Sequence, residues 1–354
     1  MKEREWEIIK RCAACGEFES VPAGFIIDSP WMPGYCGVST LDFYTDMQLW
    51  LDCYDRVKRD FPDAVFLPDY WVEFGMASEP SSFGCKMQFY ADQPVMINHL
   101  IDSADDIELL DGLEIPDPQH DGLMPLALNY YRRIKSPLHD RGEKIKIVAS
   151  RGPLNIATFL MGVSEFCIAV KTDPDNVHKL LQKTTELVKR WIAAQMEALD
   201  YVEGILVLDD ICGFLGRDDY EEFAQPYLRQ IFDGFSVPVK MFHNDNFGNK
   251  YTTFPYIKEL GVNIFNFSHL ADITEARRLL GESVCIMGNV PTLDVLTNGT
   301  PAQCRAETLK CLDAYGRKSG LLLSGGGGIS PGMSRENGRA MMDALAEWNA
   351  AHKS

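Results

Sequence analysis

The sequence predicts a (β/α)8 barrel, and three observations support this fold class. Eight short apolar runs alternate with helical patterns along the 354 residues. The runs are apolar throughout rather than strictly alternating, as is typical of parallel strands covered on both faces. No GxGxxG motif follows the first run, which disfavours the rival open, dinucleotide-binding sheet. We therefore expect one barrel domain over residues 1–354.

The strands predicted from these runs end in a polar residue or a glycine, after which a loop begins. They cover residues 23–28, 63–69, 144–150, 204–210, 237–243, 262–268, 283–289 and 320–326. Residues before the first strand form an N-terminal extension. Residues 70–140 do not fit a simple strand–helix unit, and we expect an insertion that covers the barrel mouth as a lid.

Helical patterns fill the intervals after residue 150. Residues 173–199 carry apolar side chains at near-helical spacing behind the capping residues Asp173 and Pro174. The remaining predicted helices cover residues 217–235, 272–281, 300–316 and 337–352. Glycines at the ends of two of these patterns, Gly281 and Gly316, mark where the helices stop.

Acidic residues dominate the charge of the chain. Asp and Glu number 51 against 34 Lys and Arg, for a net charge of −17. Such a surface lacks the positive patch of a nucleic-acid binder and is repelled by anionic membranes. The N-terminus has no uninterrupted apolar segment, and no stretch approaches the roughly 20 apolar residues of a membrane span. We expect a cytoplasmic protein that binds neither nucleic acid nor membranes.

Ten cysteines are too dispersed in a chain of this size for a disulfide scaffold. We expect them as reduced thiols. Cys12 and Cys15 form a CxxC pair without a second pair, so a structural role in an amphipathic helix is favoured over zinc binding.

Function in a (β/α)8 barrel lies at the carboxyl ends of the strands. The predicted ends carry Asp28, Asp69, Arg151, Asp209, Asp210, His243, Asp245, Asn266 and Asn289. His243 ends an apolar strand, and Asp245 follows two positions later on the same side of an extended chain. A histidine with a carboxylate binds zinc or performs acid–base chemistry. The competing interpretations are a loop histidine bonded to the backbone and aspartates that cap a helix.

Aromatic residues follow the first two strands. Trp31 and Tyr35 come after the first, and Tyr70, Trp71 and Phe74 come after the second. They are candidates to line an apolar substrate pocket, although ordinary lid packing explains them equally well. The glycine run at 324–330 indicates either a close approach to a ligand or a tight turn.

Several segments of the downstream half resemble the uroporphyrinogen decarboxylase superfamily, which includes corrinoid-dependent methyltransferases. The matching segments are 152–162, 173–181, 206–210, 219–232, 241–245, 266–281, 288–290 and 324–345. Decarboxylases of the superfamily carry an arginine-rich N-terminal motif that grips the carboxylates of a tetrapyrrole. The corresponding stretch here, residues 21–40, contains no Arg or Lys. Thiol-methylating members use two cysteines, and Asp245 and Gly327 stand at or near those positions here.

The branch that demethylates phenyl methyl ethers resembles this sequence better. The resemblance implies zinc held by two acids and a histidine, with Glu222 lying 21 positions before His243. The expected earlier glutamate falls at Val207, so Asp209 or Asp210 would replace it. We expect zinc ligands at His243, Glu222 and Asp245 and catalytic roles for Asp209, Asp210, His243 and Asp245. Expected substrate-binding residues are Asp28, Trp31, Tyr35, Tyr70, Trp71, Arg151, Asn266 and Asn289.

The resemblance implies a methyltransferase. A methyl group from a small methylated substrate, such as a phenyl methyl ether, passes to the cobalt of a cobalamin carried by a separate corrinoid protein. The alternatives are a tetrapyrrole decarboxylase of the uroporphyrinogen type and a barrel that binds a tetrapyrrole or corrinoid without turnover. The resemblance leaves homodimer formation open.

Overall fold

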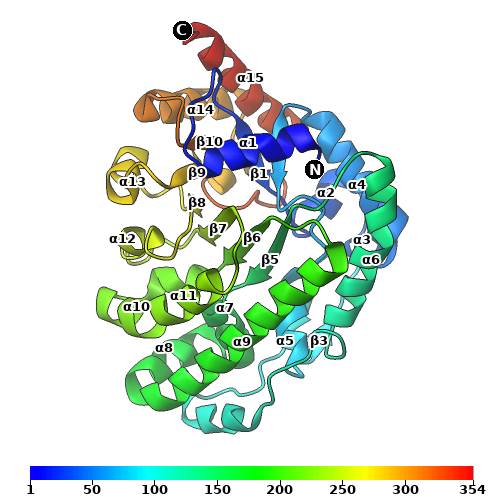
Figure 1. The fold of residues 1–354 in the computed structure, drawn as a ribbon, viewed down its shortest axis with the longest axis vertical. Helices are drawn as coiled ribbons and strands as arrows, with labels where there is room; N and C mark the ends of the chain where they lie inside the picture. The colour runs from blue at the N-terminus through cyan, green and yellow to red at the C-terminus, as the bar shows by residue number, and fades with distance from the viewer. Residues whose placement is uncertain (354) are drawn as a thin grey trace.

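The computed structural model describes residues 1–353, and an eight-stranded parallel sheet nearly closed into a barrel forms its centre (Figure 1). The strands are β1 (Ala23–Ile26), β2 (Ala64–Leu67), β5 (Ile147–Arg151), β6 (Gly204–Leu208), β7 (Val239–Asn244), β8 (Ile264–Phe267), β9 (Cys285–Val290) and β10 (Leu321–Gly325). They pair in the order β2-β1-β10-β9-β8-β7-β6-β5. The predicted (β/α)8 class is confirmed, and each strand lies within or beside its expected range.

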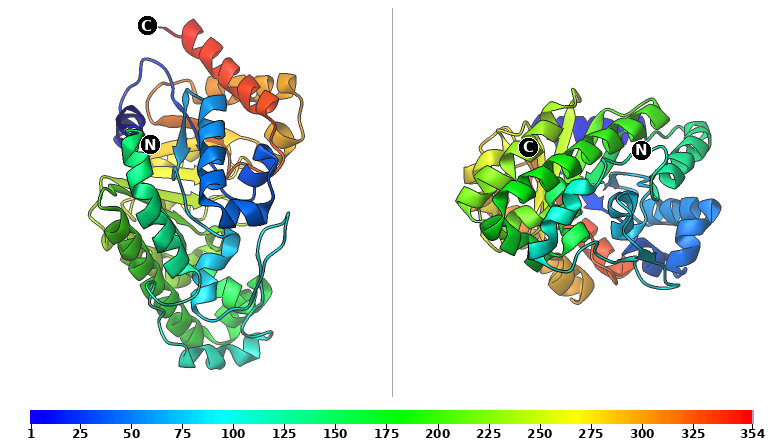
Figure 2. Two further views of the ribbon diagram at one scale, coloured as in Figure 1. Left: turned by 90° about the vertical axis from the view of Figure 1, so that its right-hand side faces the viewer. Right: turned by 90° about the horizontal axis from the view of Figure 1, so that it is seen from below.

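Helices form the outer layer of the barrel (Figures 1 and 2). The principal ones are α4 (Met47–Asp60), α6 (Met124–Asp140), α7 (Pro153–Met161), α8 (Val163–Thr172), α9 (Pro174–Leu199), α10 (Arg217–Phe223), α11 (Gln225–Asp233), α13 (Ile273–Leu280), α14 (Pro301–Tyr315) and α15 (Arg335–Ala351). The single helix predicted over 217–235 is wrong in one respect, because it breaks at Ala224. Pro226 lacks an N–H and cannot continue the hydrogen bonding of α10.

The N-terminal extension forms the amphipathic helix α1 (Glu3–Ala13). Its buried face packs against side chains that point into the barrel. Its buried residues Trp6, Ile9 and Cys12 join a cluster with the inward-facing side chains of the strands. The same cluster includes Trp71, which follows β2. These side chains fill the barrel interior, so only the loops at the carboxyl ends of the strands are free to build a site.

Residues 70–140 hold several short elements before the long helix α6. They are η1 (Gly75–Ala77), α5 (Ser78–Ser82), a hairpin of β3 (Met87–Gln88) and β4 (Met96–Ile97), and η2 (Ala104–Gly112). Glu73 accepts a hydrogen bond from the Ser29 N–H after β1, and Glu79 accepts one from the Arg151 N–H on β5. The start of this segment therefore contacts the carboxyl ends of two strands.

In residues 1–353 we find no single helix with both the length and the apolar composition needed to cross a membrane. The pair α7 and α8 meets the criterion jointly, but the two helices are bent by 103° where they meet.

Candidate active site at the carboxyl ends of the strands

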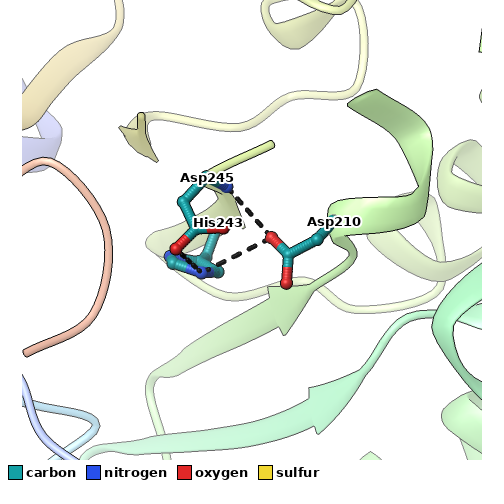
Figure 3. A group of neighbouring side chains, drawn as sticks. All are labelled: Asp210, His243 and Asp245. Atoms are coloured by element: carbon teal, nitrogen blue, oxygen red, sulfur yellow. Dashed lines mark hydrogen bonds and ion pairs between the residues drawn. The ribbon is translucent and has the colours of Figure 1, made fainter. Parts of the chain in front are cut away.

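Three side chains that can ligate a metal meet at the ends of β6 and β7 (Figure 3). His243 lies on β7, beside Leu208 of β6 in the sheet register, and Asp210 follows β6 by two positions. His243 Nε2 lies 3.6 Å from Asp210 Oδ1 and 3.9 Å from Asp245 Oδ2. The Asp245 N–H donates to Asp210 Oδ1 at 3.0 Å. Neighbouring parallel strands end at one edge, and this brings the predicted residues together.

Asn266 on β8 fixes the orientation of the imidazole. Its Nδ2 donates to the carbonyl oxygens of Met287 and Gly325, at 2.8 and 3.1 Å. Its Oδ1 therefore faces His243 Nδ1 at 2.7 Å and accepts the ring proton there. The consequence is that Nε2, the nitrogen that faces the two carboxylates, is free to act as a base or as a metal ligand.

The histidine and its carboxylates influence each other's protonation. Burial disfavours the imidazolium of His243, but the charges of Asp210 and Asp245 outweigh burial and raise the pKa of His243. Desolvation raises the pKa of Asp210 to about 6, although the attraction of His243 opposes it. His243 is nearly buried, whereas the Asp210 and Asp245 side chains are 37% and 47% exposed. The cluster therefore opens toward solvent on its carboxylate side.

The donor set fits a divalent cation such as zinc. One imidazole nitrogen and two carboxylate oxygens lie within 4.8 Å of one another. Zinc accepts these ligand types, and three protein ligands leave a coordination position for a substrate atom. A hydrogen bond donated by the far ring nitrogen, here to Asn266 Oδ1, is typical of metal-ligating histidines.

A second polar group, built around Arg151 at the end of β5, lies at the same edge. The Arg151 guanidinium pairs with Glu73 at 3.4 Å, and each side chain is only 3% exposed. It also lies 4.7 Å from the centre of the Trp71 ring. Sequence reasoning missed Glu73 and Glu79, since both fall in the predicted insertion. Their acidic character within an otherwise apolar stretch was the available signal.

Asp28 connects the two groups electrostatically. Burial raises the pKa of Asp28 to about 7, Glu73 adds to this effect, and Arg151 and His243 oppose it. Several buried polar atoms near the strand ends lack a hydrogen-bond partner within residues 1–353. They include Asp28 Oδ1, Glu79 Oε2, Arg151 Nη1, Asn244 Nδ2, Asn289 Oδ1 and Ser324 Oγ. Unsatisfied buried donors and acceptors at one edge indicate a polar ligand site.

Gly327 brings the backbone of the glycine run against the first cluster. Its φ is +119°, and a Cβ there would lie 2.8 Å from Asp245 Oδ2. The glycine run therefore packs against Asp245, and its close approach to a ligand stays a prediction.

Asp209 does not join the cluster, although it neighbours Asp210 in sequence. It is fully buried, and its Oδ2 accepts the Leu154 N–H at 2.9 Å. Asp209 therefore caps the start of α7, and its expected catalytic role stays a prediction. A Cβ at Gly152 would overlap the Asp209 carboxylate, so glycine is required at that position.

Glu222 is also remote from the cluster. Its side chain is 56% exposed on α10 and lies 3.4 Å from His178. Helix α10 points this residue toward α9 rather than toward the barrel axis. The expectation that Glu222 ligates the metal with His243 is therefore not met by the geometry, and Asp210 occupies that place instead.

The four aromatic candidates serve packing. Trp31 donates from its indole nitrogen to the Met333 carbonyl at 3.1 Å, and Tyr35 donates to Asp60 at 2.8 Å. Tyr70 is fully buried and hydrogen-bonds Glu143, while Trp71 belongs to the barrel interior beneath Arg151. The interpretation as packing describes these residues better than a substrate-lining role. Asn289 remains at the site, with its Nδ2 donating to the Ala271 carbonyl and its Oδ1 unpartnered.

The fold and the polar clusters at the strand ends are those of a (β/α)8-barrel enzyme. The chain belongs to the uroporphyrinogen decarboxylase (URO-D) family, whose model matches residues 36–348. The family-level resemblance seen in the sequence is thereby confirmed.

Named relatives fall in two groups. Uroporphyrinogen decarboxylases from Pseudoalteromonas translucida and Pseudomonas paraeruginosa are 26% and 28% identical to it, over 77% of this chain and 77% and 76% of theirs. A solved structure described as a methyltransferase from Methanosarcina mazei superposes with a TM-score of 0.79 at 18% identity, covering 98% of this chain and 99% of that one. The structural likeness extends over the whole barrel.

Proposed function

We propose that this protein is a methyltransferase that moves a methyl group from a small methyl ether to the cobalt of a separate corrinoid protein. The observation that carries the proposal is the cluster of Asp210, His243 and Asp245. Asn266 accepts the proton of His243 Nδ1, which leaves Nε2 free to face the two carboxylates. Support also comes from the methyltransferase of Methanosarcina mazei, which has the same fold.

Asp210, His243 and Asp245 are the residues that would hold a zinc ion in this proposal. A bound zinc ion supplies a Lewis acid that stabilises negative charge on the oxygen that loses its methyl group. The protein's own contribution is to orient the ligands. Asn266 holds the imidazole, and the Asp245 N–H holds the Asp210 carboxylate.

The charges at the mouth favour a neutral methyl donor. Arg151 is the one buried arginine in the described part of the chain. Three acids lie around it: Asp28, Glu73 and Glu79. An anionic substrate would lose its hydration there and meet excess negative charge, which is costly. The unpartnered Arg151 Nη1 and Asp28 Oδ1 offer one donor and one acceptor to a polar group on the substrate body.

The same charge balance weighs against the second candidate, a uroporphyrinogen decarboxylase, which the names of the curated relatives favour. A highly carboxylated porphyrinogen needs several cations, and residues 21–40 supply no Arg or Lys. The two functions differ in a simple readout, because decarboxylation releases carbon dioxide without a corrinoid.

Exposed apolar residues on the loops after three strands support a protein partner. Phe214 follows β6, Leu270 follows β8 and Leu293 follows β9, and they are 49%, 65% and 53% exposed. Exposed apolar side chains beside a site are available for contact with a partner protein. We assign this apolar rim to the corrinoid protein.

Methyl transfer tests the proposal directly. Purified protein, zinc, a cobalt(I) corrinoid and neutral methoxybenzenes are mixed, and formation of methylcobalt is followed by its absorbance. We expect transfer with the wild type, and a loss of about 10²-fold or more with His243→Ala. Release of carbon dioxide from uroporphyrinogen with no methyl transfer would instead establish the decarboxylase.

A further inference from the structure

Cysteines lie near one another in pairs at two places in the fold. Cys36 ends α2 (Met32–Cys36), and its thiol donates to the carbonyl oxygen of Cys53 in α4, with Sγ 3.8 Å from that oxygen. Cys12 of α1 and Cys285 of β9 belong to the same buried cluster. All ten cysteines are free thiols in the structure.

The two pairs differ in access to solvent. Cys12 and Cys285 are both 0% exposed, inside the closed end of the barrel. Cys53 is 3% exposed, but Cys36 is only half-buried. A small reagent in solution can therefore reach one thiol of the outer pair and neither thiol of the inner pair, which makes the inner pair an internal control.

Arg56 places positive charge beside Cys36. It lies three residues after Cys53 on α4, and its Nη1 donates to the Cys36 carbonyl at 2.9 Å. The guanidinium also lies 5.4 Å from the centre of the Tyr35 ring. The neighbouring Cys53 side chain lowers the pKa of Cys36, burial opposes this effect, and Arg56 lowers the pKa further. A stabilised, partly exposed thiolate beside a second cysteine is the arrangement of a redox-active cysteine pair.

We propose that Cys36 and Cys53 are a site of reversible oxidation that closes to a disulfide when the protein meets a hydroperoxide. The Cys36 thiolate attacks the O–O bond, giving a cysteine sulfenic acid and releasing an alcohol, or water from hydrogen peroxide. The Cys53 sulfur then attacks the Cys36 sulfur, the S–S bond forms, and the hydroxyl leaves as water with the Cys53 proton. Two thiols lose two electrons, and the peroxide gains them.

The bond would tie the segment after β1 to α4. Asp28 lies four residues before α2 begins, so this segment connects the strand-end cluster to the pair. The proposal itself rests on the thiol geometry and is independent of the methyltransferase assignment.

Peptide mapping after peroxide treatment tests the proposal on the full chain. Reduced protein is exposed to hydrogen peroxide, and the remaining thiols are alkylated after unfolding. Trypsin leaves residues 12–56 as one peptide, since no Lys or Arg lies between Arg11 and Arg56. Cleavage before Asp42 and Asp46 separates Cys36 from Cys53. We expect a Cys36–Cys53 link, reversed by dithiothreitol, that forms at least about tenfold faster than any link involving Cys12 or Cys285.

Two variants make the test specific. Cys53→Ser leaves Cys36 to stop at the sulfenic acid, which a dimedone reagent traps, and Arg56→Met slows oxidation of Cys36. Equal unfolding midpoints of the reduced proteins show that the variants keep the fold. The proposal is overturned if Cys36 and Cys53 stay reduced while other cysteines oxidise, or if Cys36 pairs with a different cysteine.

Discussion

At the scale of single residues, Asn266 sets the orientation of the His243 imidazole. Asn266 is fully buried, and its amide nitrogen donates to two backbone carbonyls. The direction of its side-chain oxygen is therefore fixed. The residue is a positioning residue, because it acts on the site through the imidazole. Asn266 was predicted as a site residue, but its role depends on how carbonyls of β9 and β10 approach its amide group in the fold.

Asn266→Ala leaves His243 Nδ1 without its acceptor. We expect zinc affinity to fall by roughly 10–100-fold, the range measured when orienting partners of metal ligands are removed. Competition with a chromophoric chelator gives the dissociation constant. Asn289→Ala is the matched control, since Asn289 is a buried asparagine on the adjacent strand without a hydrogen bond to His243. Equal affinities in the two variants would contradict the role of Asn266.

The raised pKa of Asp28 predicts how the stability of the folded protein depends on pH. Its pKa is about 7 in the folded protein and near 3.8 when unfolded, mainly because of burial. Between these values the folded state holds the extra proton, so this residue makes stability decrease as pH rises from about 4 to 7. Asp28→Asn should flatten that decrease. Denaturant unfolding at several pH values measures it, and an unchanged slope would refute the assignment.

At the scale of elements, the buried acid Asp209 stabilises the turn from β5 into α7. Asp209 follows β6 and accepts a backbone N–H of α7, which begins after the neighbouring strand. The close approach is tolerated because position 152 has no side chain.

Gly152→Ala should therefore destabilise the protein by about 1–3 kcal/mol, the usual cost of overpacking a buried contact. The shift of the urea midpoint measures it. Gly216→Ala is the control, because a Cβ at Gly216 meets nothing within 4 Å and its φ is −65°. Similar midpoints for both variants would show that Asp209 can move, against the capping role.

At the scale of the whole molecule, the strand periodicity and the helix signals were sufficient to predict the barrel. Parallel strands end at one edge, so the polar residues that follow them could be expected there. These residues are Asp28, Arg151, Asp210, His243, Asp245 and Asn266. Sequence could not place residues whose direction is set by local turns. Glu222 points outward on α10, Tyr35 and Tyr70 pack outside the strands, and Glu73 reaches the site from an irregular segment.

The metal content of the purified protein tests the central claim most directly. Our account predicts close to one zinc per chain after supplementation, loss of this zinc in His243→Ala and Asp245→Ala, and retention in Glu222→Ala. The last variant separates the observed cluster from the ligand set expected from sequence. A wild-type protein that binds no zinc, or a Glu222→Ala variant that loses zinc as fully as His243→Ala, would contradict the account.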